Sequence, residues 1–444
     1  MKGIQIVANS DQIKKIQRIY ESENIPAAEK LYASKSQTTD FKGFGVAITG
    51  SSCYQLSLME SEERKELLRN VYGKDGLGLT VARISIGASD YSAELYSYDD
   101  VPFDTELKYF SVERDEKYVI PMIKEILEIE PQLYILASPW SPPGWMKTGG
   151  LLCGGYMRME YVECYAEYVV KFIKAYAAHG IKISAVTPQN EPNTQQAGRM
   201  PACIWHPEIE AEFVKCLRKK LDENALDVEI WMFDHNFNDT QRVLWQLKNI
   251  DGLADSCDGV AYHYYTGRIE ETIALNREFP KLARHFTEGG PRLYDNYGTD
   301  WCKWGIMMTK VLSHGFSSFI GWNLLLNEVG APNIGPFGCG GLVTRNSATG
   351  ELSYSGQYKA LSQYSPYITP ASKIRSLSVG EEFGDVIADY PKSDKAPCGI
   401  LIENDNEQIC VVINPNSTKK QVQLVIDGHI WYAELDPNSI STFM

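Results

Sequence analysis

The feature that most constrains this chain is an alternation of short apolar segments with amphipathic segments between residues 42 and 365. Each apolar segment is six or seven residues long, which fits a strand that is buried on both faces. The eight strand candidates are FGVAIT (44–49), VARISIG (81–87), LYILAS (133–138), KISAVT (182–187), VEIWMF (228–233), GVAYHY (259–264), ARHFTE (283–288) and SFIGWN (318–323).

Helical patterns separate these strands. The clearest pattern places Tyr165, Val169, Phe172 and Tyr176 on one stripe and ends before Gly180. The predicted helices cover Ser61–Val71, Pro121–Ile129, Tyr161–His179, Glu208–Leu221 and Trp301–Leu312. Eight strands that alternate with helices predict a closed (β/α)8 TIM barrel over residues 42–365, rather than an open doubly wound sheet.

The pattern changes in the C-terminal segment, residues 366–444. The strand candidates GILIEN, EQICVVINP, KKQVQLVIDG and IWYAEL follow one another there with polar turns and no helical pattern between them. In VQLVI, residues Val422, Leu424 and Ile426 share one face. IQIV (4–7), in the N-terminal segment 1–41, has no partner in the barrel. We therefore predict a side antiparallel β-sandwich domain that is built from both chain ends.

Charge and composition exclude several classes of partner. The 444 residues carry a formal net charge of −14, with no run of Lys and Arg, which disfavours nucleic acid and anionic lipid surfaces. The chain starts without an apolar stretch of signal-peptide length, and no window approaches the ~18 apolar residues of a membrane span. The ten cysteines form no C-x-x-C pair, which is typical of thiols in a reducing compartment. We therefore expect a cytoplasmic protein with no membrane span.

Catalytic groups of a (β/α)8 barrel sit where the strands end, because the βα loops open there. Among the residues that follow the predicted strands, two are glutamates: Glu191 after the fourth strand and Glu288 after the seventh. The other polar or aromatic residues at strand ends are Asp90, Trp140, Trp145, Lys147, Asn190, Asp234, His235, His263, Tyr264, Tyr265, Trp322 and Asn323.

Two carboxyl groups among Trp and Tyr side chains suit the hydrolysis of a glycosidic bond. One carboxyl protonates the leaving oxygen, and the other attacks the anomeric carbon or activates water. Aromatic faces fit the C–H faces of a sugar ring. A lone Glu after a strand is more often a loop charge or a helix cap, so the prediction depends on the pair rather than on either residue.

Three further candidate residues could have a structural role rather than a role in binding substrate. Asp90 could cap the next segment, but we predict that it binds a sugar hydroxyl. His263 could be a satisfied core histidine, and we include it and Asp234 among the substrate-binding residues. Asp234, His235 and His263 could also suggest a metal site, but an acid–base pair needs no metal, so we predict none. No phosphate-binding glycine motif opens a helix, and we expect no cofactor.

The same residues carry a resemblance to a known family. LASPWSPPGWMKTGG, AVTPQNEP, AYHYY, TEGG and GWNLLLNEVGAPN look like glycoside hydrolase family 30, the glucosylceramidase family, and RISIGASDYSAELYSYDD and the GFG of FKGFGVAIT strengthen the match. The resemblance covers nearly the whole predicted barrel. It implies a (β/α)8 barrel with a side β-sandwich and retaining hydrolysis without a metal. Two departures from the animal glucosylceramidases, the segment NIGPFGCGGLVTRN and the lack of a secretion signal, leave a lipid substrate open.

The resemblance also implies residue roles. Glu191 would be the acid/base and Glu288 the nucleophile, and the subsite for the released sugar would be lined by Asp90, Trp140, Asn190, Tyr265 and Trp322. Retaining enzymes hold their two carboxyls roughly 5–5.5 Å apart, and like charges at that distance resist joint ionisation. We therefore expect the pKa of Glu191 to lie above its ordinary value.

These observations predict a retaining β-glycosidase that removes terminal β-glucosyl residues from a β-linked glycoside or oligosaccharide. A β-1,6-glucanase or a β-xylosidase of the same family is the alternative within the class. A catalytically silent carbohydrate-binding barrel is the alternative outside it, and the presence of both glutamates disfavours it.

Overall fold

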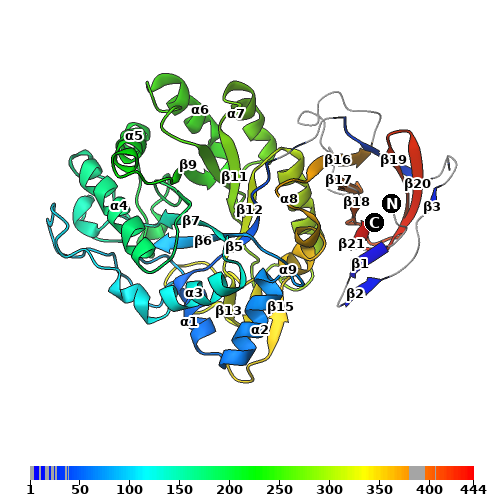
Figure 1. Ribbon diagram of the computed structural model, residues 1–444, viewed down its shortest axis with the longest axis horizontal. Helices are drawn as coiled ribbons and strands as arrows, with labels where there is room; N and C mark the ends of the chain where they lie inside the picture. The colour runs from blue at the N-terminus through cyan, green and yellow to red at the C-terminus, as the bar shows by residue number, and fades with distance from the viewer. Residues whose placement is uncertain are drawn as a thin grey trace.

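Eight parallel strands close into a barrel in the computed structural model (Figure 1), as the alternation predicts. The structure describes residues 40–379, 396–405 and 407–444, and in the N-terminal segment residues 5–9, 12–15, 20–21, 25, 28–35 and 38. The barrel strands are β5 (Gly43–Ala47), β6 (Val81–Ile86), β7 (Tyr134–Pro139), β8 (Ala185–Val186), β9 (Glu229–Asn236), β10 (Gly259–His263), β11 (Ala283–Glu288) and β12 (Ser318–Gly321). Every strand candidate of residues 42–365 is therefore confirmed.

The helices pack outside this barrel. The five predicted ones appear within two residues of their expected ends. They are α2 (Ser61–Tyr72), α3 (Val119–Ile129), α4 (Val162–Ala178), α5 (Pro207–Glu223) and α8 (Trp301–Ser313). The others described are α1 (Gly50–Ser57), α6 (Thr240–Asn249), α7 (Ile273–Glu278) and α9 (Gly356–Leu361). Tyr165, Val169, Phe172 and Tyr176 of α4 are all buried, which confirms the predicted stripe.

Burial on both faces explains why the strands are nearly continuous apolar runs. Side chains such as Leu136, Trp231 and Ile320 fill the inside of the barrel. The alternate residues, for example Ile135, Ile230 and Phe319, pack outward in the large core that includes helix residues. This two-sided burial is the usual condition of a parallel sheet.

Two strands differ from their predicted lengths. β8 has only two paired residues instead of the six of KISAVT, because the chain turns towards the site after Val186. β9 runs on to Asn236, and Phe233 and Asp234 adopt φ values of 78° and 72° within it. The register between β9 and β10 shifts at this bulge, between Ala261 and Tyr262. The bulge therefore places Asp234 inside the barrel rather than in the loop after it.

Both chain ends build the second domain, which lies beside α8 in Figure 1. Its strands run in the order β2-β1-β21-β18-β17-β16-β4-β19-β20-β3. Their bounds are β1 (Gln5–Asn9), β2 (Gln12–Lys15), β3 (Tyr20–Glu21), β4 (Glu29–Ala33), β16 (Lys373–Val379), β17 (Cys398–Asn404), β18 (Glu407–Asn414), β19 (Lys420–Ile426), β20 (His429–Leu435) and β21 (Ser439–Phe443). The predicted N-terminal strand is confirmed, since β1 pairs antiparallel with β21. Only the pairing of β4 with β19 is parallel among these described strands.

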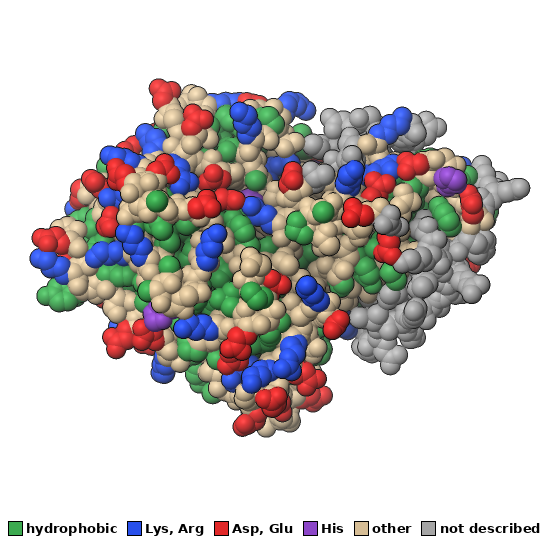
Figure 2. Space-filling model, in the orientation of Figure 1, with side chains coloured by type: hydrophobic (Ala, Val, Ile, Leu, Met, Phe, Trp, Pro, Cys, Tyr) green, Lys and Arg blue, Asp and Glu red, His purple; other side chains and the backbone are tan. Residues whose placement is uncertain are grey.

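A small sheet follows the last barrel strand. It consists of β13 (Leu325–Asn327), β14 (Val343–Arg345) and β15 (Leu352–Tyr354), and the loop between β13 and β14 contacts the segment after β6, where Ile334 N donates to Asp90 O. None of the described helices is long and apolar enough to cross a membrane. On the face shown in Figure 2, Lys and Arg side chains are interspersed with Asp and Glu side chains.

Candidate active site

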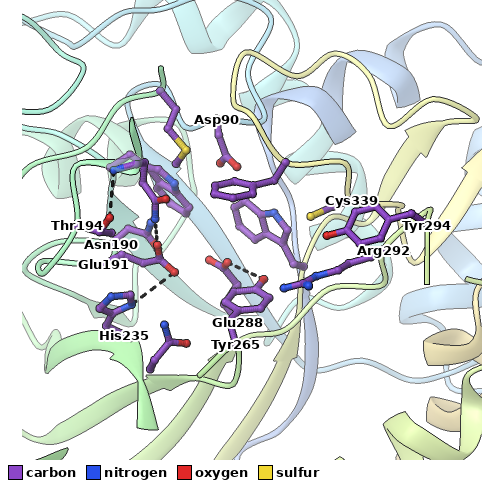
Figure 3. A pocket seen from close by; sticks show the side chains of 16 residues that line it. Asp90, Asn190, Glu191, Thr194, His235, Tyr265, Glu288, Arg292, Tyr294 and Cys339 are labelled. Carbon is purple, nitrogen blue, oxygen red and sulfur yellow. Dashed lines mark hydrogen bonds and ion pairs between the residues drawn. The ribbon is translucent and has the colours of Figure 1, made fainter. Parts of the chain in front are cut away.

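A cavity of about 330 Å³ opens at the carboxyl ends of the barrel strands. Seven of the nine predicted site residues line it: Asp90, Trp140, Asn190, Glu191, Tyr265, Glu288 and Trp322. Sequence reasoning did not assign the other nine, which are Thr194, Gln196, Met200, His235, Asn236, Arg292, Tyr294, Phe337 and Cys339. Most of these nine lie on long loops, where periodicity gives no signal. Figure 3 shows the two glutamates in this cavity.

Glu288, the last residue of β11, has a donor on each carboxylate oxygen. Arg83 Nη1 donates to Oε2 at 2.5 Å, and the Tyr265 hydroxyl donates to Oε1 at 2.9 Å. Tyr265 directly follows the neighbouring strand β10, whereas Arg83 reaches Glu288 across the inside of the barrel from β6. The carboxylate is therefore fixed in orientation while its edge still lines the cavity.

Arg83 is the main site residue that sequence reasoning missed. It lies within β6 and is fully buried, and its guanidinium also donates to Asn190 Oδ1 at 2.8 Å and to Asp234 Oδ2 at 2.7 Å. The guanidinium lies 4.8 Å from the Trp140 ring centroid. A signal was present, since an Arg inside an apolar strand is buried at a cost and needs charged partners there.

Glu191 stands just after the short β8 with φ 53°, a left-handed conformation that glutamate rarely adopts. Its backbone N–H donates to Asp234 O at 3.0 Å, which joins this turn to the β9 bulge. On the side chain, His263 Nδ1 lies 3.1 Å and His235 Nδ1 3.5 Å from Oε1, and Gln196 donates to Oε2. Donors therefore surround the carboxylate on both oxygens.

These donors reverse the pKa expected for Glu191. Burial raises the pKa of this carboxyl, but the neighbouring imidazoles of His235 and His263 outweigh burial and lower it to about 2. The sequence predicted a raised pKa from the nearby charge of Glu288, so that prediction is wrong. The sequence placed both histidines at strand ends but did not show that these two imidazoles, from β9 and β10, meet at Glu191.

Asp234 and His263 reach the site but do not line the cavity, contrary to the predicted contact with substrate. Both side chains are fully buried. The Asp234 oxygens already accept from Arg83, from the hydroxyls of Thr187 and Thr287, and from His263. Because burial and these partners leave no face for a sugar, the two residues support the residues above them.

Asp90 has an unsatisfied acceptor in the cavity wall. Its side chain is buried, and Oδ1 has no hydrogen-bond partner among the described residues. Burial raises the pKa of Asp90 well above its ordinary value, and the charges of Glu288 and Glu191 raise it further. Buried polar atoms in native proteins normally have partners, so this one indicates a place for a ligand hydroxyl.

Two tryptophans form the apolar side of the cavity. The rings of Trp140 and Trp322 stack at 5.2 Å between centroids, and Tyr91 meets Trp322 edge-on at 6.0 Å. Further out, Phe337 and Tyr294 are exposed lining residues. The cavity therefore has a deep apolar wall beside its polar groups and aromatic side chains at its mouth.

One set of side chains has the spacing of metal ligands. Glu191, His235 and His263 each place a ligand-type atom within 4.8 Å of the others. Two of these atoms, Oε1 of Glu191 and Nδ1 of His263, are directly hydrogen-bonded to each other. The two imidazoles therefore lie close enough to Glu191 to influence its protonation.

A (β/α)8 barrel whose cavity combines two glutamates with stacked tryptophans defines a glycoside hydrolase of the two-carboxylate class. Residues 41–337 match the glycosyl hydrolase family 30 TIM-barrel domain. The chain belongs to this family, whose members are retaining glycosidases.

The curated relatives of this chain are named for two different activities. The chain is 28% identical to putative glucosylceramidase 4 of Caenorhabditis elegans, over 94% of this chain and 84% of that protein. It is 26% identical to the endo-1,6-beta-D-glucanase of Neurospora crassa, over 91% and 85% of the two chains.

Solved structures share the whole architecture. SrfJ from Salmonella typhimurium matches with a TM-score of 0.89 at 24% identity, covering 100% of this chain and 99% of that one. An endo-beta1,6-glucanase matches with a TM-score of 0.84 at 26% identity, covering 99% and 98%. The barrel and the sheet domain therefore occur together in both.

Proposed function

We propose that this glycosidase uses Glu288 as its nucleophile and Glu191 as its acid/base. Glu288 is held by Arg83 and Tyr265 with its edge in the cavity, as a carboxylate that attacks an anomeric carbon must be. Glu191 is the carboxyl next to imidazoles that can exchange a proton with it. In the first step Glu288 forms a glycosyl ester while the leaving oxygen takes a proton from Glu191, and in the second Glu191 takes a proton from the attacking water.

We propose further that the substrate is a β-glucoside bound by its terminal sugar. The observation that carries this is the unpaired Oδ1 of Asp90. The loop after β13 covers this residue, since Ile334 N donates to Asp90 O at 2.8 Å. A carboxyl at a covered end of the cavity suits the hydroxyls of a sugar that has no further residue attached there. In Figure 3 Asp90 stands apart from Glu288 and Tyr265.

The β-1,6-glucanase alternative has support of its own. Tyr294 and Phe337 are 70% and 46% exposed at the cavity mouth, where they can stack on a second sugar. Relatives named as endo-1,6-beta-D-glucanases match over most of the chain. A glucan chain would therefore extend from the first sugar past these aromatic side chains.

A substrate panel separates these activities. Nitrophenyl β-glucoside, nitrophenyl β-xyloside, a β-1,6-glucan and a panel of β-linked disaccharides are compared by kcat/KM and by the products formed. We expect glucose as the first product and the β-glucoside to exceed the β-xyloside. Oligosaccharides as the first products from the glucan would instead establish the endo-acting alternative, and a preference for the xyloside would contradict the glucoside proposal.

A further inference from the structure

The imidazole of His263 lies between two carboxyl groups. Its Nδ1 is 3.1 Å from Glu191 Oε1, and its Nε2 is 3.0 Å from Asp234 Oδ1. The ring is fully buried, so water does not take either place. A neutral imidazole has only one N–H, whereas two carboxylates are both acceptors. Each of the two contacts needs a proton. The three groups together must therefore hold one proton more than a neutral histidine and two carboxylates would hold.

Asp234 does not hold this extra proton. Its Oδ2 accepts from the Arg83 guanidinium at 2.7 Å and from the Thr187 hydroxyl at 2.8 Å. Its Oδ1 accepts from the Thr287 hydroxyl at 2.6 Å as well as facing His263. Donors already occupy both oxygens, and the donor Arg83 is positively charged, so Asp234 is held as a carboxylate. Burial raises its pKa, but Arg83 and the hydrogen bonds outweigh burial and lower it. The N–H on Nε2 of His263 is thereby fixed, and the extra proton lies between Nδ1 and Glu191.

We propose that His263 stores the proton that Glu191 delivers to the leaving group, so that the two residues work as one acid held in place by Asp234. His263 is a positioning residue in this scheme, because it acts through Glu191 and touches no substrate. The inference rests on the proposed role of Glu191 as the acid/base. It also explains how a carboxyl whose pKa is lowered by its neighbours can serve as an acid.

The proton balance closes over the two steps. Before reaction the pair holds one exchangeable proton, on Nδ1 of His263 or on Glu191. When the glycosidic bond breaks, its electron pair goes to the leaving oxygen, which takes that proton, while Glu288 bonds to the anomeric carbon. The pair is then neutral imidazole plus carboxylate. Water attacks the anomeric carbon in the second step, the ester bond to Glu288 breaks, and the water proton returns to the pair.

Gln196 fits this scheme, since it donates to the second oxygen of Glu191 and lines the cavity. A donor at that oxygen favours the carboxylate, with the proton on His263. A leaving oxygen that displaces Gln196 removes this donor. Binding of substrate would therefore move the proton from Nδ1 to Glu191 when it is needed.

Several other groups act on the same proton. Glu288 Oε2 from β11 lies 3.9 Å from Nε2 of His263, and His235 from β9 lies 3.5 Å from the shared Glu191 oxygen. Arg83 is positive and is bonded to both Asp234 and Glu288. Burial lowers the pKa of His263, but Glu288, Asp234 and Glu191 outweigh burial and raise it to about 9.

Two more cavity groups complete the surroundings of the pair. The charge of Glu191 contributes to the raised pKa of Asp90 and also to that of Tyr265, although burial is the largest cause for both. Neither residue is a hydrogen-bond partner of His263, whose partners are Glu191 and Asp234. The pair should therefore lose its proton only as the pH rises towards 9, well above the pH at which a lone glutamate loses one.

The test combines a pH profile with NMR on the full-length enzyme. The kcat/KM for an alkyl β-glucoside, whose leaving group needs a proton, is measured against pH for the wild type and for His263→Gln. We expect the basic limb of His263→Gln to move at least one pH unit lower, because Glu191 then holds its proton alone. In ¹⁵N-histidine spectra, the resonances that are present in the wild type and absent from His263→Gln belong to His263. At neutral pH these resonances should have the chemical shifts of an imidazolium.

The matched control is His235→Gln, which removes the other imidazole beside the same oxygen. The structure gives His235 Nδ1 no hydrogen bond, so its loss should move the basic limb less than the loss of His263. Any of three results would overturn the proposal. The rate could fall uniformly without a shift of the basic limb of the pH profile, the basic limb could shift equally in both variants, or His263 could be neutral at pH 7. If azide fails to rescue Glu191→Ala, the acid/base assignment itself is wrong. If azide rescues it and the limb does not move, only the proton store is wrong.

Discussion

Each glutamate owes its place to one local feature of the backbone. Glu288 simply ends β11, so a strand pattern followed by polar residues predicts it. Glu191 lies in a turn with φ 53° that Asp234 O secures, and its partners are histidines from two other strands. The position of Glu191 could be predicted from the sequence, because it depends on one strand end. The protonation of Glu191 could not be predicted, because it depends on how the turn after β8 meets the strands β9 and β10.

Glu288→Gln should abolish turnover while a substrate still binds. The amide keeps the shape of the carboxylate but cannot form the glycosyl ester. We expect kcat to fall by at least about 10⁴-fold, of the order seen when a catalytic nucleophile is removed. A mechanism-based fluoro-sugar should label Glu288 in the wild type, as peptide mass spectrometry can show. Label on any other carboxyl group would overturn this assignment.

Glu191→Ala should depend on the leaving group. Activated aryl glycosides need no proton, so their first step should survive, whereas alkyl glycosides should lose most of their rate. Azide can replace the missing base in the second step and should give a β-glycosyl azide at a restored rate. Product analysis by NMR checks this. An α-glycosyl azide, or an equal loss on both kinds of leaving group, contradicts the acid/base role.

At the scale of elements, the regular parts were predictable and the departures from regularity were not. The barrel strands follow from two-sided burial, which leaves an apolar run in the sequence. The bulge at Phe233 and Asp234 leaves no such pattern, yet it moves Asp234 from the predicted loop into the barrel. The loop over Asp90 was visible only as the unusual segment NIGPFGCGGLVTRN, with no indication that it covers the cavity.

The cover over Asp90 can be tested at Gly335. A Cβ there would lie 2.8 Å from Asp90 Cβ, so Gly335→Ala must push the loop or Asp90 aside. The loss of one hydrogen bond to the substrate, ~1.4 kcal/mol, predicts a fall of about tenfold in kcat/KM on the β-glucoside. Gly338→Ala in the same loop is the control, because its Cβ would meet only the Tyr294 ring at 3.8 Å. Equal effects of the two changes would show that the loop does not position Asp90.

At the scale of the whole molecule, one apolar core runs through both domains. Ile400, Val411 and Ile440 of the sheet domain belong to the same buried cluster as Trp304 and Met308 of α8 and the outer faces of the barrel strands. The other face of the sheet has its own cluster, which includes Leu31, Leu377 and Leu424. Because the shared core has no polar boundary at α8, we expect the two domains to unfold together in a single transition.

Gly305 in α8 tests this coupling, because a Cβ there would lie 2.8 Å from Ile440 Cδ1 and 3.2 Å from Ile413 Cδ1. Gly305→Ala should change stability little, since the ends of two isoleucines can shift and alanine favours the helix by ~1 kcal/mol. Gly305→Leu overfills the contact and should cost about 1–3 kcal/mol. Calorimetry should show a single unfolding transition, and its midpoint temperature should fall only in Gly305→Leu. None of the described residues of α8 or the sheet domain lines the cavity, so kcat/KM at 25 °C should be unchanged in both variants. Two separate transitions, with only one of them moved by leucine, would show that the domains fold independently.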